Sequence, residues 1–177
     1  IQQPSVSAKN EGIEECAKLV QKILNTSGIQ SEILRLKKGV APIVFGVVKS
    51  KQNPEKTLMF YNHYDVQPVE PFDLWDDPPF SGIRKGNKIF GRGATDDKGE
   101  LITRIKAVEA CLKTTGDVPC NVKFVIEGEE ETEVSISDQL YVYGGVFPLN
   151  VKSILPVDSP LHPSTSVIIT EVEYPIG

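Results

Sequence analysis

Residue types that bind metal ions follow the apolar run "TLMFYN", where His63 and Asp65 stand two positions apart. In an extended backbone the side chains of residues i and i+2 point to the same face. A carboxylate beside a metal-bound imidazole fixes the orientation and the tautomer of the ring. The pair is therefore suited to a site in which one residue binds the ion and the other steers it.

Carboxylates gather at two further places in the sequence. The stretch "FGRGATDDKGE" sets Asp96 and Asp97 side by side after a glycine-rich turn. The stretch "FVIEGEEE" ends an apolar run with a cluster of glutamates, namely Glu127, Glu129, Glu130 and Glu131. Because like charges at this density repel one another, the cluster calls for cations. Zn²⁺ accepts both imidazole and carboxylate, so His63, Asp96 and a glutamate form a chemically sensible donor set.

Each of these signals has a plainer interpretation when it is taken singly. A histidine at a strand end is usually satisfied by its neighbours, and a run of glutamates is usually a solvated loop. Two other kinds of site fail on spacing, because the stretch around Asp96 lacks both the D-x-[DN]-x-[DN]-G calcium pattern and the G-x-x-x-x-G-K-[ST] phosphate pattern. Trp75 and Phe80 either rim a pocket or pack beneath a proline-rich loop.

Composition narrows the partners and the surroundings of the protein. The 177 residues, 40% of them hydrophobic, suffice for one ordinary core. A net charge of -5 argues against nucleic acid and anionic lipid as partners, and no apolar run approaches the roughly 20 residues that span a membrane. The cysteines are odd in number and form no C-x-x-C pair, which indicates reduced thiols and a cytoplasmic location: Cys16, Cys111 and Cys120.

Helical and extended patterns alternate along the chain, which predicts an α/β fold. Apolar residues at helical spacing predict helices over 10–27 and 98–115, the first capped by Asn10 and the two followed by Gly28 and Gly116. Near-continuous apolar runs predict strands of a mixed, mostly parallel twisted sheet that the helices flank. These runs are 31–36, 42–49, 57–63 and 121–128.

Functional sites of α/β proteins lie beyond the carboxyl ends of their strands. We therefore expect His63, Asp96 and Glu131 to converge at one edge of the sheet. The carboxylates of Asp96 and Glu131 should then lie within about 8 Å of each other, as a two-metal centre requires.

The pattern changes after Glu131. Too few residues separate it from "YGG" for a crossover helix and a return strand, which take about a dozen residues or more. A further strand is predicted from Ser166 to Tyr174. The sequence begins at Ile1 without a methionine and stops at "EVEYPIG" without a helix cap, so both ends look cut.

The order and wording of the motifs point to a family. Between Thr57 and Glu131 the chain reads "HYDVQP", then "GRGATDDKG", then "EGEEE". This resembles the dinuclear zinc peptidases that include carnosinase-type dipeptidases, glutamate carboxypeptidase, acetylornithine deacetylase and succinyl-diaminopimelate desuccinylase, and it is closest to the dipeptidase branch. The resemblance implies hydrolysis of the amide bond of dipeptides or short peptides with two Zn²⁺ ions, for which Co²⁺ or Mn²⁺ are alternatives.

The resemblance also implies a role for each motif residue. His63 would bind one zinc, Asp96 would bridge both ions, and Glu131 would be a terminal ligand of the other. Asp65 would orient His63. Glu130 would be the general base that takes a proton from water and passes it to the leaving amine.

The backbone of the aspartate pair is a further implication of the resemblance. The peptide bond between Asp96 and Asp97 would be cis, with Asp96 aimed at both metals and Asp97 facing away toward Arg92 or Lys98. Glycines would allow the turn into this bond and the close start of the next helix: Gly91, Gly93 and Gly99.

The chain departs from the family in its length. Residues 1–138 are interpreted as a partial catalytic domain and residues 139–177 as a remnant that resembles the start of a lid and dimerisation domain. A homodimer through this remnant is an alternative that stays open. The family's second zinc also needs an acidic residue from the next strand and a C-terminal histidine; Asp138 is a candidate for the first, whereas His162 matches no such context.

Two classes of function remain open from the sequence. The first is a zinc-dependent dipeptidase or carboxypeptidase, with an N-acyl amino acid deacylase as a variant of it. The second is a truncated scaffold of the same fold without hydrolase activity. Because His63, Asp96 and Glu131 leave positions of a dinuclear site open, we expect weak binding of the second zinc and little or no dipeptidase activity from this polypeptide.

Overall fold

The computed structural model describes residues 1–132, which belong to one compact unit, Ile1–Gln139. The predictions about Asp138, His162, a strand over 166–174 and a boundary at residue 138 lie outside the described residues. The described elements are η1 (Ser7–Lys9), α1 (Ile13–Thr26), β1 (Gln30–Leu34), β2 (Ile43–Val48), β3 (Thr57–His63), η2 (Phe72–Leu74), β4 (Ile83–Lys85), β5 (Lys88–Phe90), α2 (Lys98–Thr115) and β6 (Asn121–Glu127).

The main sheet has the strand order β1-β2-β6-β3. It is mixed, as predicted, but it is not mostly parallel among the described strands: only β3 pairs with β6 in parallel, and the other two pairings are antiparallel. The connection 35–42 between β1 and β2 is too short for a crossover of about a dozen residues or more, so these strands return on themselves. The longer connection from β3 to β6 contains α2 and permits the parallel pair.

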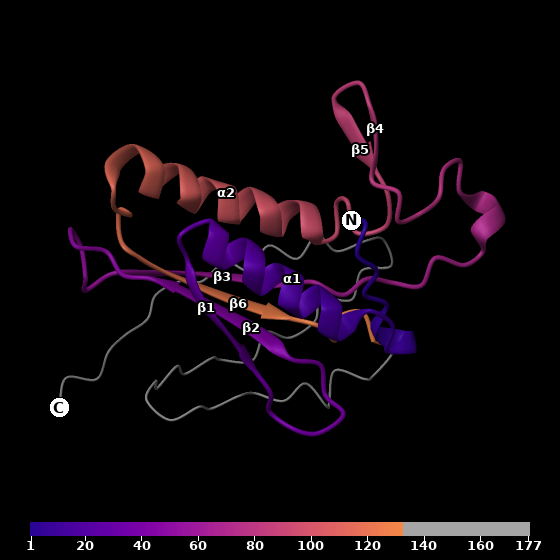
Figure 1. The fold of residues 1–177 in the computed structure, drawn as a ribbon, viewed down its shortest axis with the longest axis horizontal. Helices are drawn as coiled ribbons and strands as arrows, with labels where there is room; N and C mark the ends of the chain where they lie inside the picture. Colours follow the sequence, from indigo (N-terminus) through magenta and orange to yellow (C-terminus); the bar gives the residue numbers. More distant parts are fainter. Residues whose placement is uncertain (133–177) are drawn as a thin grey trace, which may run out of the picture. The chain divides into compact units, whose positions relative to one another are not determined.

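Both helices cover the same face of the sheet (Figure 1). The side chains that alternate inward on β6, Val122, Phe124 and Ile126, are buried together with Leu24 of α1 and Ile105 of α2. This arrangement follows from the sequence, because the apolar residues of each helix recur every three or four positions and so form one stripe. Neither helix of the described part has the length and apolar character of a membrane-spanning segment.

The predicted C-terminal ends of both helices are confirmed, but the predicted cap at the start of α1 is wrong. Gly28 and Gly116 follow α1 and α2 with φ values of 82° and 72°, as the predicted stops require. Asn10 does not cap α1, however, because it ends η1 with a φ of 50°, and α1 begins at Ile13 after Gly12. A Cβ at Gly12 would lie 2.2 Å from the carbonyl oxygen of Pro4, so the N-terminal segment passes too close for any other residue.

Candidate metal centre

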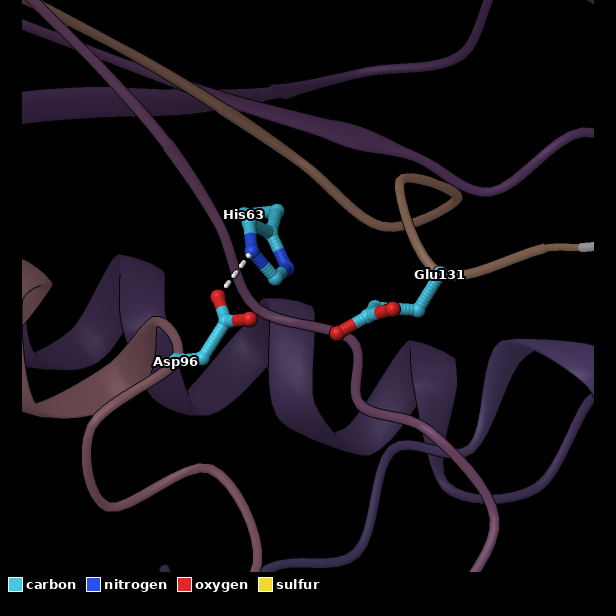
Figure 2. A group of neighbouring side chains, drawn as sticks. All are labelled: His63, Asp96 and Glu131. Atoms are coloured by element: carbon cyan, nitrogen blue, oxygen red, sulfur yellow. Dashed lines mark hydrogen bonds and ion pairs between the residues drawn. The ribbon is translucent and has the colours of Figure 1, made fainter. Parts of the chain in front are cut away.

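The parallel pair of strands brings two of the motifs to one edge of the sheet. His63 and Glu127 are the last residues of β3 and β6, and they are opposite each other in the register. Asp96 lies two residues before α2, which starts beside the end of β3. Because β3 and β6 end where α2 begins, side chains far apart in the sequence meet there (Figure 2).

The predicted triad of His63, Asp96 and Glu131 is brought together. Each residue offers one ligand atom, and the three atoms lie within 4.8 Å of one another. His63 Nε2 is 2.9 Å from Asp96 Oδ1. Asp96 and Glu131 therefore lie well inside the separation of about 8 Å that a shared two-metal centre allows. The side chain of His63 is 8% exposed and that of Asp96 is 74% exposed, so the cluster opens to solvent on the aspartate side.

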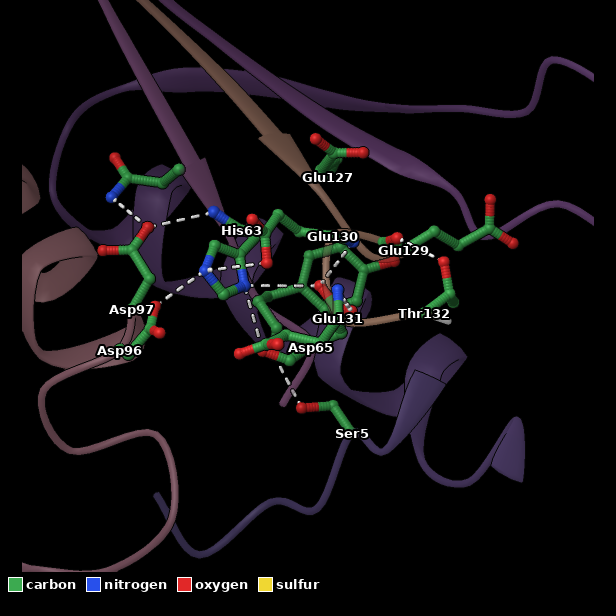
Figure 3. Close-up of polar contacts among 12 residues, drawn as sticks. Ser5, His63, Asp65, Asp96, Asp97, Glu127, Glu129, Glu130, Glu131 and Thr132 are labelled. Atoms are coloured by element: carbon green, nitrogen blue, oxygen red, sulfur yellow. Dashed lines mark hydrogen bonds and ion pairs between the residues drawn. The ribbon is translucent and has the colours of Figure 1, made fainter. Parts of the chain in front are cut away.

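Asp65 contacts both His63 and the turn after β6 that carries Glu130 and Glu131. Its side chain is fully buried, and His63 Nδ1 is 3.1 Å from its carbonyl oxygen and 3.4 Å from Oδ1. The same carboxylate accepts hydrogen bonds from the backbone N–H groups of Glu130 at 3.2 Å and Glu131 at 2.8 Å (Figure 3). Asp65 thus holds the imidazole through its carbonyl oxygen and its carboxylate, and the carboxylate also holds the turn that carries both glutamates.

The N-terminal segment supports the loop that contains Asp65. Ser5 Oγ donates to the carbonyl oxygen of Tyr64 at 2.6 Å, and the backbone N–H of Val66 donates to the carbonyl oxygen of Ser5 at 2.9 Å. Lys98 Nζ donates to the carbonyl oxygen of Gln3 at 2.8 Å. The first two bonds fix the loop 64–66 against the N-terminal segment, and the third ties that segment to the start of α2.

Asp97 is placed differently from the expectation. The Asp96–Asp97 peptide bond is cis, as the resemblance implied. Asp97, however, does not face Arg92 or Lys98: its Oδ2 accepts hydrogen bonds from Asn62 Nδ2 at 2.7 Å and from the backbone N–H of His63 at 3.0 Å. Asp97 is only 9% exposed and lies against the end of β3, which supplies both donors.

The two cations that were expected near Asp97 have other partners. Lys98 reaches the N-terminal segment, and Arg92 Nη2 donates to the carbonyl oxygen of Pro68 at 3.0 Å. The Arg92 guanidinium also lies 5.2 Å from the centre of the Trp75 ring. Trp75 Nε1 donates to the carbonyl oxygen of Val69 at 2.8 Å, so this half-buried aromatic is tied to the preceding loop.

The four glutamates separate by environment. Glu131 joins the triad and accepts a hydrogen bond from Gln67, a residue to which the sequence drew no attention. Glu129 Oε1 accepts the backbone N–H of Ala41 at 2.9 Å. Glu127 is bonded by the Tyr61 hydroxyl, and burial together with the charges of its neighbours Glu130 and Glu129 raises its pKa to about 7.

Glu130 lies beside the triad, with Oε2 3.9 Å from His63 Nε2. Burial raises the pKa of Glu130, the charge of His63 opposes this change, and the nearby carboxylates add to it. A carboxylate with a raised pKa is a better proton acceptor at neutral pH than an ordinary glutamate. The position and the basicity of Glu130 are both compatible with proton transfer at this site.

The carboxylates around His63 favour its protonated form at neutral pH when no metal is bound. Burial lowers its pKa, but the hydrogen bond with Asp65 and the charges of Asp65, Glu130 and Asp97 outweigh burial and raise the pKa to about 9. Both ring nitrogens face oxygen acceptors, which suits an imidazolium. A single positive charge thus lies at the centre of a cluster of carboxylates.

This charge predicts how the stability of the metal-free chain depends on pH. The pKa of His63 is raised from 6.5, so its contribution is complete below pH 6.5 and is lost as the pH rises through about 9. We expect the free energy of unfolding, measured by urea denaturation in a chelator, to fall by at most about 3 kcal/mol across this window. His63→Gln should remove that part of the decline, and the difference between the two profiles isolates His63. Parallel profiles would contradict the prediction.

Three comparisons with known proteins agree on a family. A model of peptidase family M20/M25/M40 matches residues 59–167. Beta-Ala-His dipeptidase of Mus musculus is 32% identical over 144 residues, which is 71% of this chain and 29% of that protein. Cys-Gly metallodipeptidase of Schizosaccharomyces pombe is 44% identical over 91 residues, which is 51% of this chain and 19% of that protein.

A solved structure supports the same relationship. An M20 family metallo-carboxypeptidase from Sulfolobus solfataricus is 39% identical, with a TM-score of 0.66 over 73% of this chain and 29% of that chain. The chain therefore spans less than a third of the length of each of these relatives. The described sheet and its two helices correspond to part of a larger fold.

Proposed function

The chain belongs to peptidase family M20/M25/M40, and from this premise we propose that it carries the metal-binding part of a hydrolase that cleaves the peptide bond of dipeptides or short peptides. One observation carries the proposal: His63, Asp96 and Glu131 come from three separate segments, and their donor atoms lie within 4.8 Å of one another. A solvated acidic loop would give no reason for a buried imidazole to lie among the carboxylates.

The donor set fits a divalent transition metal. One imidazole nitrogen and two carboxylates are ligands that Zn²⁺ accepts, and Co²⁺ or Mn²⁺ accept them as well. We propose that His63, Asp96 and Glu131 would hold two Zn²⁺ ions. When bound, such ions polarise an amide carbonyl and lower the pKa of water.

The remaining residues of the site handle protons and orientation. Glu130 is the proposed general base: it takes a proton from the attacking water and gives it to the leaving amine. Its raised pKa and its place beside His63 support this role. Asp65 holds the ring of His63 through Nδ1, which leaves Nε2 directed at Asp96. The contacts of Glu130 and Asp65 with His63 support both proposed roles.

The substrate class and the location are inferred from the relatives and the cysteines. Relatives named Beta-Ala-His dipeptidase and Cys-Gly metallodipeptidase support dipeptides as substrates. A relative named succinyl-diaminopimelate desuccinylase, 34% identical over 133 residues, keeps N-acyl amino acids as the second substrate class to be assayed. We propose a cytoplasmic location because all three cysteines are unpaired, as is usual in a reducing compartment.

The function is tested by separating metal binding from hydrolysis. We expect the 177-residue chain to bind Zn²⁺, measured as metal per chain after dialysis, and to show little dipeptidase activity on β-alanyl-histidine. Glu130→Gln should reduce cleavage to the level of the metal-free chain, since general base catalysis contributes about 10²- to 10⁴-fold. The same variant should bind Zn²⁺ as the unmodified chain does. Zinc content near zero in the unmodified chain would favour the inactive scaffold, and unchanged cleavage by Glu130→Gln would exclude the proposed base.

A further inference from the structure

Asp97 makes two hydrogen bonds that the proposed mechanism does not use. A single oxygen, Oδ2, accepts both the side-chain N–H of Asn62 at 2.7 Å and the backbone N–H of His63 at 3.0 Å. All three residues are buried: Asn62 is 1% exposed, His63 is 6% and Asp97 is 9%. Asp97 therefore ties the segment that ends at Asp96 to the strand that ends at His63 (Figure 3).

In another orientation the side chain of Asp97 would stabilise α2. Asp97 is the residue before α2, where an aspartate commonly accepts a hydrogen bond from a backbone N–H of the first helical turn. Its side chain makes no such bond. The Asp97 carboxylate points toward β3 and bonds Asn62 and His63 there. It therefore does not stabilise the first turn of α2.

Asn62 is likewise oriented toward Asp97. Its Oδ1 is buried and has no hydrogen-bond partner among the described residues. A buried amide oxygen without a partner costs about 1–3 kcal/mol. Turning the amide over would give up the bond from Nδ2 to the Asp97 carboxylate, which is an acceptor when ionised. The orientation of Asn62 is thus set by Asp97, although it leaves an oxygen unsatisfied.

We propose that Asp97 and Asn62 are positioning residues that hold His63 and Asp96 at the separation that a shared metal ion needs. Asp97 does not belong to the triad, and it acts through the backbone of His63 and through its bond to Asp96. The inference rests on the proposed function, because it assigns to this pair a role in metal affinity. Residues that hold metal ligands in place typically change the affinity by about 10- to 100-fold when they are replaced.

The test compares variants of Asp97 that lose the same charge. In Asp97→Asn an amide oxygen can occupy the place of Oδ2 and accept both hydrogen bonds, whereas in Asp97→Ala no acceptor remains. Zn²⁺ affinity is measured by titration of the full chain, and Co²⁺ is used as a second probe whose absorption spectrum reports the ligand geometry. We expect Asp97→Ala to bind Zn²⁺ at least about tenfold more weakly than Asp97→Asn, and to change the Co²⁺ spectrum.

Two further variants separate positioning from stability. Asn62→Ala keeps the charge of Asp97 and should also weaken Zn²⁺ binding. Asp117→Ala is the matched control, because Asp117 is 8% exposed and accepts the backbone N–H of Lys51 at the opposite end of α2. It should lower the melting temperature without changing the Zn²⁺ affinity.

The outcomes distinguish this inference from the function on which it rests. Equal affinities of Asp97→Asn and Asp97→Ala would mean that only the charge matters, and would overturn the positioning role while the metal site stands. If Asp97→Ala does not fold, Asn62→Ala decides, and an affinity equal to that of the unmodified chain overturns the role. An unmodified chain that binds neither Zn²⁺ nor Co²⁺ would overturn the proposed function and this inference with it.

Discussion

Replacing His63 with alanine is expected to abolish the stabilisation of the chain by Zn²⁺. A ligand that binds only the folded state adds about 2.7 kcal/mol to the free energy of unfolding when its free concentration is 100 times its dissociation constant. His63 offers the imidazole of the triad, and the other donors are carboxylates. Without it, the loss of affinity should exceed the roughly 10- to 100-fold that follows from replacing a supporting residue.

For each variant, the free energy of unfolding is measured by urea denaturation, once with a chelator and once with excess Zn²⁺, and the two values are compared. This comparison removes the direct cost of deleting a buried side chain, because that cost is present with and without metal. Glu131→Gln and Glu129→Gln form a matched pair, since they remove the same charge two positions apart and only Glu131 belongs to the triad. The stabilisation by Zn²⁺ should shrink in Glu131→Gln and persist in Glu129→Gln, whose amide oxygen can still accept the N–H of Ala41. Equal responses of the two variants would mean that zinc binds the acidic turn without regard to the triad.

The features that could be predicted from sequence are those that depend on residue type and period. The stripe of apolar residues on α2 and the glycine after it determine where this helix lies and where it ends. The convergence of His63 with Glu131 was predictable because polar residues at the carboxyl ends of neighbouring parallel strands meet at one sheet edge. In each case the information is local, and the tertiary structure only assembles it.

The features that were missed depend on contacts between distant segments. Asn10 has the right side chain for a helix cap, but the approach of Pro4 to Gly12 moves the start of α1. The partners of Asp97 could not be read from its neighbours in sequence, because Asn62 reaches it only once β3 lies beside the start of α2. The expectation of Arg92 or Lys98 relied on nearness along the chain, which does not determine nearness in space.

A short hairpin was missed for a different reason. β4 and β5 are three residues each, too short to show an alternating pattern, and they project from the body of the unit (Figure 1). The turn between them contains Gly86 with a φ of 62°, followed by Asn87. This Gly-Asn pair is a known hairpin signal, so the turn could have been recognised without its strands.

Gly99→Ala is expected to destabilise the chain by about 2 kcal/mol or more and to weaken Zn²⁺ binding by about tenfold or more. Gly99 is the second residue of α2, where alanine would ordinarily be favoured over glycine by about 1 kcal/mol. A Cβ at this position would lie 2.0 Å from the carbonyl oxygen of Ala94, and a backbone atom cannot rotate away as a side chain can. Ala94 stands two residues before Asp96, so the shift that relieves the contact displaces a proposed metal ligand.

Gly46→Ala is the matched control for this substitution. Gly46 lies in β2, where the nearest atoms to a Cβ belong to side chains. Those of Ile29 at 3.2 Å and Leu24 at 3.4 Å can adjust, and Phe124 Cβ at 3.4 Å is at an ordinary contact distance. The loss in free energy of unfolding should stay below the range of about 1–3 kcal/mol that overpacking usually brings. The Zn²⁺ affinity should not change, because β2 contributes no residue to the triad. Urea denaturation and Zn²⁺ titration of the two variants measure both quantities. A Gly99→Ala chain that gains stability would show that helix propensity outweighs the contact with Ala94; a chain that loses stability but keeps full Zn²⁺ affinity would show that the loop before Asp96 yields without moving the ligand.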